Sequence, residues 1–132
     1  MGRRGRAPIL VVDDDSATRE GLAEFLTELG YSVLAREDGQ GAMNLLVGGL
    51  EPALLIVDLG MPHLRGDELL KYMQADPELR LVPVLVVTGS PEQMGRAVAD
   101  AVLTKPIDLV TLLAQVQRLM AKTRQTRRQP TD

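Results

Sequence analysis

Short apolar runs alternate with amphipathic stretches along the whole chain. Three of the runs are continuously apolar, and they cover residues 9–12, 53–57 and 83–87. Runs of this kind are typical of strands that are buried on both faces of a parallel sheet. Two shorter and weaker strands are predicted at residues 32–36 and 101–104. The sequence therefore predicts five strands.

The stretches between the strands have the spacing of amphipathic helices. In the first, which starts at Ser16, apolar residues at positions 22, 25, 26 and 29 share one face, and Gly30 follows as a C-terminal cap. Further helices are predicted at residues 41–47, around residues 69–73, at residues 92–99 and after Asp108. Because five strands alternate with five helices, the fold class is α/β, with a parallel sheet covered on both faces and right-handed crossovers.

The length and composition indicate one folded domain with short polar ends. The chain has 132 residues, of which 45% are hydrophobic and 25% charged, as in soluble globular proteins. We expect a basic extension at residues 1–7, the domain itself at residues 8–122, and a basic, disordered tail at residues 123–132. No apolar run approaches the about 20 residues of a membrane span, and cysteine is absent. Both observations lead us to expect a cytoplasmic protein with no membrane contact.

The net charge of −3 hides an uneven distribution. Residues 1–7 carry three arginines, and residues 118–132 carry five basic residues against one acidic residue, so residues 8–117 have a net charge of −10. A body this acidic repels a phosphate backbone. We therefore expect no direct nucleic-acid binding by the domain, and we interpret the basic ends as solvated tails or linkers.

Polar residues follow the predicted strands at the points where these strands end. Asp13 and Asp14 follow the first strand, Asp58 the third, Thr88 the fourth and Lys105 the fifth. In an open α/β sheet, ligands bind beyond the carboxyl ends of the strands, where all of these residues would meet. A single aspartate after a strand carries little information, but this convergence indicates a site.

Three carboxylates that lie close together repel one another unless a cation lies between them. Aspartate and backbone carbonyl oxygens, completed by water, are the ligands that Mg²⁺ prefers, so the site is predicted to bind magnesium. The ammonium of Lys105 would add a second positive charge to the cluster and pair with Asp58. The alternative interpretation is a solvated acidic rim with one structural salt bridge.

Four motifs in order resemble the receiver domain of bacterial response regulators in two-component signalling. They are residues 10–15 (LVVDDD), residues 56–62 (IVDLGMP) followed by Gly66, residues 84–89 (VLVVTG), and Lys105-Pro106. The resemblance covers about residues 8–121. It implies a flavodoxin-like, doubly wound sheet with strand order 2-1-3-4-5.

The resemblance also implies a role for each matching residue. Asp58 would be the phosphoacceptor, which takes a phosphoryl group from a sensor histidine kinase or phosphotransfer protein. Lys105 would neutralise that group, the Thr88 hydroxyl would bond one of its oxygens and move inward on activation, and the Lys105-Pro106 peptide bond would be cis. These roles fit phosphoryl transfer in general, where positioning and charge neutralisation supply most of the catalysis.

The magnesium ligands implied by the resemblance come from two loops. Asp14 and Asp58 would bind Mg²⁺ through their carboxylates and Gly60 through its backbone carbonyl. Asp13 would hold a metal-bound water. Mg²⁺ is the only cofactor that the resemblance implies.

Two departures from the family pattern concern output, that is, how phosphorylation would change the surface that a partner recognises. Only 17 positions separate Lys105 from Thr88, so the fourth helix is shortened to residues 92–99, about two turns. Val102 stands where relatives carry an aromatic residue. We therefore expect phosphorylation to act mainly through residues 88–92 and the short helix after them, with the fifth strand nearly still. We also expect the domain to be a monomer or a weak dimer.

Three functions compete for this sequence. The leading one is a phosphorylation-driven signalling module that is not an enzyme beyond its own phosphoryl transfer and slow aspartyl-phosphate hydrolysis. The second is a protein-interaction module that signals without phosphate, but its usual mark, loss of the acidic residues or the lysine, is absent. The third is an aspartyl-nucleophile phosphatase or phosphotransferase, which generally needs a second catalytic aspartate where Gly60 stands. The output partner is not indicated by any motif.

Overall fold

The computed structural model describes residues 7–59, 66–91 and 99–128, with the backbone alone for residues 66–67 and 123–128. Five parallel strands form one sheet in the order β2-β1-β3-β4-β5, as predicted. The strands are β1 (Ile9–Val12), β2 (Val33–Arg36), β3 (Leu54–Val57), β4 (Val84–Thr88) and β5 (Ala101–Thr104). This is the flavodoxin-like order, in which the chain reverses direction across the sheet between β1 and β3.

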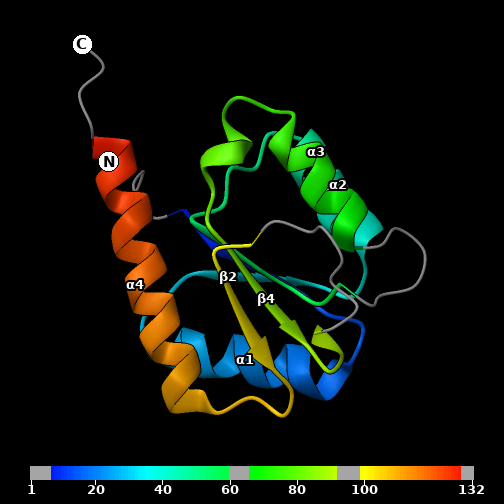
Figure 1. Ribbon diagram of the computed structural model, residues 1–132, viewed down its shortest axis with the longest axis vertical. Helices are drawn as coiled ribbons and strands as arrows, with labels where there is room; N and C mark the ends of the chain where they lie inside the picture. The colour runs from blue at the N-terminus through cyan, green and yellow to red at the C-terminus, as the bar shows by residue number, and fades with distance from the viewer. Residues whose placement is uncertain (1–6, 60–65, 92–98, 129–132) are drawn as a thin grey trace.

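Helices cover both faces of the sheet (Figure 1). The helices are α1 (Ser16–Glu28), α2 (Gly39–Val47), α3 (Gly66–Gln74) and α4 (Leu109–Arg128), and a single 3₁₀ turn, η2 (Leu79–Leu81), leads into β4. Helices α1 and α4 pack on one face, and α2 and α3 pack on the other. The described helices and strands thus form the three-layered α/β arrangement that the alternating pattern predicts.

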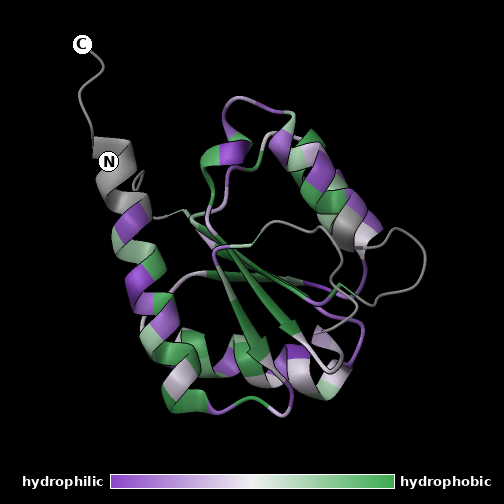
Figure 2. Cartoon of the chain, viewed as in Figure 1, coloured by the Kyte–Doolittle hydropathy of each residue, from purple (hydrophilic) through white to green (hydrophobic). Residues whose placement is uncertain are grey.

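The core is divided by the sheet into two halves, because successive side chains of a strand point to opposite faces. In β1, Leu10 and Val12 join the core under α2 and α3, whereas Ile9 and Val11 join the core under α1 and α4. All four of these side chains are buried. Figure 2 shows the strands as almost uniformly hydrophobic, while the helices mix polar and hydrophobic residues. The continuous apolar runs of the sequence are therefore explained by burial on both faces.

The helix ends follow local signals. Asp15 caps α1 by accepting a hydrogen bond from the Thr18 amide at 2.9 Å. Gly30 lies directly after the C-cap of this helix with φ of 100°, a conformation that glycine adopts without strain. Asp108 caps α4 in the same way through the Thr111 amide at 3.0 Å. These caps confirm the predicted ends of α1 and the start of α4.

The structure differs from one prediction about helices and does not describe the residues of another. The tail was expected to be disordered from residue 123, but α4 continues to Arg128. The reason is that residues 121–128 contain alanine, lysine, glutamine and arginine, which favour helix, while the first helix-breaking residue is Pro130. The shortened helix predicted at residues 92–99 lies almost wholly outside the described residues. The structure therefore leaves that prediction open.

Candidate functional site

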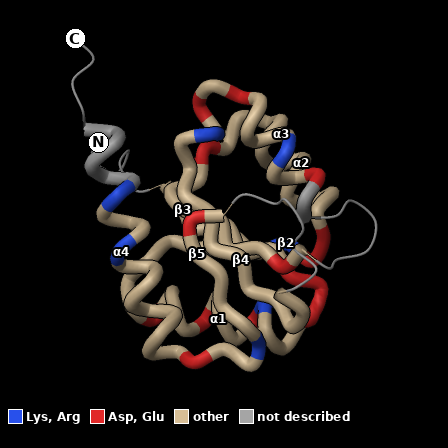
Figure 3. The backbone as a smooth tube through the Cα atoms, viewed as in Figure 1, with Lys and Arg blue, Asp and Glu red and all other residues tan. Residues whose placement is uncertain are grey.

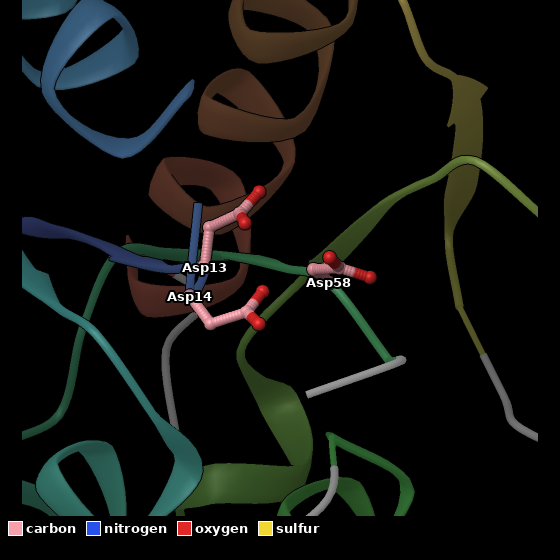
Figure 4. A group of neighbouring side chains, drawn as sticks. All are labelled: Asp13, Asp14 and Asp58. Carbon is pink, nitrogen blue, oxygen red and sulfur yellow. The ribbon is translucent and has the colours of Figure 1, made fainter. Parts of the chain in front are cut away.

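The carboxyl ends of β1 and β3 bring the acidic residues together. These strands are paired in register, with Val12 opposite Val57, so the next residues, Asp13 and Asp58, leave neighbouring strands side by side. The amide of Asp58 donates to the carbonyl of Val12 at 3.0 Å, which extends the strand pairing beyond the last apolar residue. One carboxylate oxygen from each of Asp13, Asp14 and Asp58 lies within 4.8 Å of the other two (Figure 4).

Asp13 is the buried member of this acidic cluster. Its side chain is only 3% exposed. Oδ1 accepts a hydrogen bond from the Asp15 amide at 2.9 Å, and Oδ2 lies 3.0 Å from Nζ of Lys105. Burial raises the pKa of the Asp13 carboxyl above its ordinary value, although the Asp15 amide and Lys105 act in the opposite direction. The geometry therefore leaves both oxygens of Asp13 already engaged.

Lys105 reaches the cluster from the end of β5. Its amide donates to the Thr88 carbonyl at 2.9 Å, and its Nζ lies 3.2 Å from Oδ2 of Asp58. One ammonium thus bridges two carboxylates. Burial by itself would lower the pKa of Lys105, but the hydrogen bond and negative charge of Asp13, together with Asp58, outweigh burial and raise the pKa. The Lys105-Pro106 peptide bond is cis, as the resemblance implied.

The remaining polar residues of the edge differ in exposure. Asp14, in the turn after β1, is the exposed member of the acidic cluster. Thr88 is buried at the end of β4, and its Oγ1 accepts a hydrogen bond from the Ser90 amide at 3.0 Å. That bond uses a lone pair of the hydroxyl and leaves its O–H as a donor. Gly60, the expected backbone ligand, lies outside the described residues.

The donor set fits a small divalent cation. Three carboxylates against one ammonium leave the cluster with a formal charge of −2, and every candidate donor atom is an oxygen. Hard oxygen donors are those that Mg²⁺ prefers, and among the residues that the structure describes no sulfur or imidazole ligand, of the kind that favours zinc or copper, belongs to this cluster. The residues present therefore fit the magnesium site that the sequence predicted.

Sequence reasoning missed two supporting residues, one at the carboxyl ends of the strands and one at their amino ends. Nη1 of Arg19 in α1 donates to the Asp13 carbonyl at 2.9 Å. Asp100, before β5, accepts a hydrogen bond from the Val84 amide at 2.8 Å and pairs with Lys122 of α4 at 3.0 Å. Neither carried a signal, because a lone charged residue on a helix or in a loop usually belongs to a solvated surface.

Fold and site together define a flavodoxin-like α/β domain with an acidic cluster at the carboxyl ends of its strands, and the comparison with known families identifies the class. The sequence profile described as the response regulator receiver domain matches residues 9–117. The chain belongs to this family. None of the described helices has the length and apolar character needed to cross a membrane.

Among curated relatives, the chain is 37% identical over 120 residues to the response regulator MprA of Mycolicibacterium vanbaalenii, covering 87% of this chain and 51% of the relative. It is 35% identical over 119 residues to the response regulator RR06 of Streptococcus pneumoniae, covering 86% of this chain and 53% of the relative. The chain thus spans about half the length of these relatives.

Two solved structures have the same fold. The signal receiver domain of a histidine kinase from Syntrophus aciditrophicus superimposes with a TM-score of 0.79 at 30% identity, over 87% of this chain and 90% of that chain. The response regulator TrrA of Thermotoga maritima, solved in complex with Mg²⁺ and BeF, superimposes with a TM-score of 0.75 at 28% identity, over 86% of this chain and 98% of that chain.

Proposed function

We propose that this domain receives a phosphoryl group on Asp58 from a sensor histidine kinase or a phosphotransfer protein, in a magnesium-dependent reaction. One observation carries the proposal: the Asp58 carboxylate lies at the end of β3, next to two further carboxylates and 3.2 Å from Nζ of Lys105. A nucleophile beside a cation and a metal-binding cluster is the arrangement that phosphoryl transfer requires. Membership of the receiver family supports the same function.

In the proposed reaction, a carboxylate oxygen of Asp58 attacks the phosphorus of a phosphohistidine. The new O–P bond forms as the P–N bond breaks, and the imidazole nitrogen leaves with the electron pair of that bond. The side chain of Asp58 is 13% exposed, so it is largely buried but still reachable from solvent. Lys105 already lies beside Oδ2 and is placed to pair with a phosphoryl oxygen after transfer. Thr88, at the end of the next strand, supplies a hydroxyl donor for another oxygen.

The proposed metal ligands are the Asp14 and Asp58 carboxylates and the Gly60 carbonyl, with Asp13 bound through a water. Mg²⁺ held there would neutralise negative charge on the transferring group. The assignment of Asp13 to a water-mediated role is supported by its two engaged oxygens, since Oδ1 accepts from the Asp15 amide and Oδ2 pairs with Lys105. Asp14 is exposed and is therefore the more accessible carboxylate of the pair.

The proposal extends to the setting of the domain. We place it in the cytoplasm as a monomer or weak dimer, acting through an output partner that the site does not specify. It is a signalling phosphoacceptor and not an enzyme with an external substrate, because no second aspartate follows Asp58 at the position where Gly60 stands. An acidic domain body also disfavours direct binding to nucleic acid; acidic residues outnumber basic ones over the described chain (Figure 3).

The test is intact-mass analysis after incubation with acetyl phosphate, with and without Mg²⁺. We expect the mass to rise by one phosphoryl group only when Mg²⁺ is present, and we expect Asp58→Asn to abolish the gain. Asp76→Asn is the matched control, because Asp76 lies in the turn after α3 and an asparagine keeps its acceptor oxygen for the Glu78 amide. Labelling of Asp58→Asn to the wild-type level would refute the assignment. A folded wild-type protein that gains no mass would favour the phosphate-independent interaction module.

A further inference from the structure

Arg19 of α1 is a cation that lies against the turn of residues 13–15, although it is neither the proposed nucleophile nor a proposed metal ligand. Its Nη1 donates to the Asp13 carbonyl at 2.9 Å, and its side chain is only 15% exposed. Its amide donates to the Asp15 carbonyl at 2.9 Å, which closes the first turn of α1. Arg19 therefore contacts the backbone of the turn after β1 at two points.

We infer that Arg19 is a positioning residue that orients the Asp13–Asp14 peptide unit, so that the Asp14 carboxylate stays within the acidic cluster. The inference rests on the proposed function, because it assigns a support to one of the proposed metal ligands. The physical basis is that the Asp13 carbonyl and the Asp14 amide belong to one planar unit. Fixing the direction of that carbonyl fixes the direction in which the chain enters Asp14.

The three aspartates of the turn are held in different ways. The Asp13 carboxylate is fixed by the Asp15 amide and by Lys105, and the Asp15 carboxylate is fixed by Thr18 as the cap of α1. Asp14, by contrast, is exposed, so its placement depends on the backbone of residues 13–15. The guanidinium of Arg19 donates a hydrogen bond to the Asp13 carbonyl, which belongs to the peptide unit between Asp13 and Asp14. Outer-shell groups of this kind orient the ligands of many metal sites.

The other contact of Arg19 does not explain its burial. Nη2 lies 3.9 Å from Oε2 of Glu20, whose side chain is 75% exposed, and an ion pair of this geometry contributes little to stability. A positive charge beside the site would also repel a metal ion if charge were all that mattered. If Arg19 positions the turn, its removal should weaken magnesium binding. If Arg19 acts only through its charge, its removal should strengthen magnesium binding.

The experiment is calorimetric titration of the full chain with Mg²⁺ in wild type, Arg19→Ala, Arg19→Lys and Glu20→Gln. We expect Arg19→Ala to weaken Mg²⁺ binding by about tenfold, the lower end of the range for outer-shell partners. Arg19→Lys should recover part of the loss, because a lysine keeps a charged donor on a long side chain. Glu20→Gln is the matched control, since it removes the other contact of Arg19, and it should bind Mg²⁺ as wild type does.

The outcomes separate the two proposals. Magnesium affinity of Arg19→Ala equal to or tighter than that of wild type would overturn the positioning role while leaving the proposed function intact. Absence of Mg²⁺ binding by folded wild type would overturn the proposed function itself. If circular dichroism shows that Arg19→Ala does not fold, Arg19→Gln replaces it, because a neutral amide keeps a donor but not the reach of a guanidinium. For the inference to stand, the magnesium affinity of Arg19→Gln must fall below that of Arg19→Lys.

Discussion

Nζ of Lys105 lies 3.0 Å from Oδ2 of Asp13, and the same ammonium also pairs with Asp58, which is 47 positions before Lys105 in the chain. Asp13 is 3% exposed at its side chain and Lys105 is 23% exposed. Before any cation binds, this lysine is therefore the positive charge that compensates the most buried carboxylate of the site. Lys105 thus supports the structure of the site as well as its proposed chemistry.

Replacing Lys105 with methionine should destabilise the domain, because it leaves the Asp13 carboxylate buried without its cation. We expect the free energy of unfolding to fall by about 1–3 kcal/mol, less than for a fully buried pair because Lys105 is partly exposed. Urea unfolding in chelator measures this loss, and Mg²⁺ should restore part of it. Lys105→Arg, which keeps the charge, is the control. A Lys105→Met protein as stable as wild type in chelator would contradict the structural role.

Replacing Asp14 with alanine should have the opposite effect on the metal-free protein. Asp14 is exposed and contributes negative charge to a cluster whose carboxylates lie within 4.8 Å of one another. Its removal relieves repulsion, so the variant should be as stable as wild type or more stable in chelator. Calorimetric titration should then show loss of Mg²⁺ binding. Wild-type magnesium affinity in Asp14→Ala would show that Asp14 is not a ligand.

Binding of the phosphoryl mimic beryllofluoride should change the amide of Ser90 more than that of Val102. The Ser90 amide donates to Oγ1 of Thr88 at 3.0 Å, so inward movement of this hydroxyl must alter the bond. Val102 is 39% exposed and has few rotamers, so little movement is available to it. Amide shifts from nuclear magnetic resonance, with and without the mimic, measure both.

Thr88→Val serves as the control for this switch. Valine has nearly the shape of threonine but offers the Ser90 amide no acceptor, so the Ser90 response to the mimic should be lost. Large amide shifts centred on Val102 and α4, with residues 88–90 unchanged, would contradict the prediction that the response is centred on Thr88 and Ser90. The same result would place the output surface on the edge strand β5.

Replacing Asp100 should destabilise the domain more than replacing its partner Lys122. Asp100 accepts from the Val84 amide at the start of β4. Its ion pair with Lys122 is more open to solvent, since the side chains of Asp100 and Lys122 are 31% and 54% exposed. We expect Lys122→Met to lower the free energy of unfolding by less than about 1 kcal/mol. Asp100→Ala should lower it by about 1–3 kcal/mol, because a buried amide loses its acceptor.

Urea unfolding of these two variants and of their double mutant separates the contributions. Asp100→Asn is the matched control, since its amide oxygen still accepts from Val84. Equal losses in Asp100→Ala and Lys122→Met would mean that the ion pair, and not the strand amide, accounts for the effect.

The sequence by itself determined the layout of the fold and the place of the site. The runs at residues 9–12, 53–57 and 83–87 are apolar throughout because both faces of their strands are covered, so local composition was enough to predict them. Because the carboxyl ends of parallel strands lie at one edge, the positions of Asp13, Asp58 and Lys105 directly after strands also predicted their meeting. Their chemical types then indicated a metal site, and the resemblance to receiver domains implied the phosphoryl group.

Only the tertiary structure decided which atoms hold the site in place. At the site, Lys105 bridges Asp13 and Asp58, and Arg19 holds the Asp13 carbonyl. At the opposite ends of the strands, Asp100 accepts from the Val84 amide. Each of these contacts joins residues from different elements. Hydrophobic periodicity reports which face of an element is buried, and it contains no information about the direction of a charged side chain. Those directions follow from how the helices and strands pack, which places donors and acceptors distant in sequence within 3 Å or so of one another.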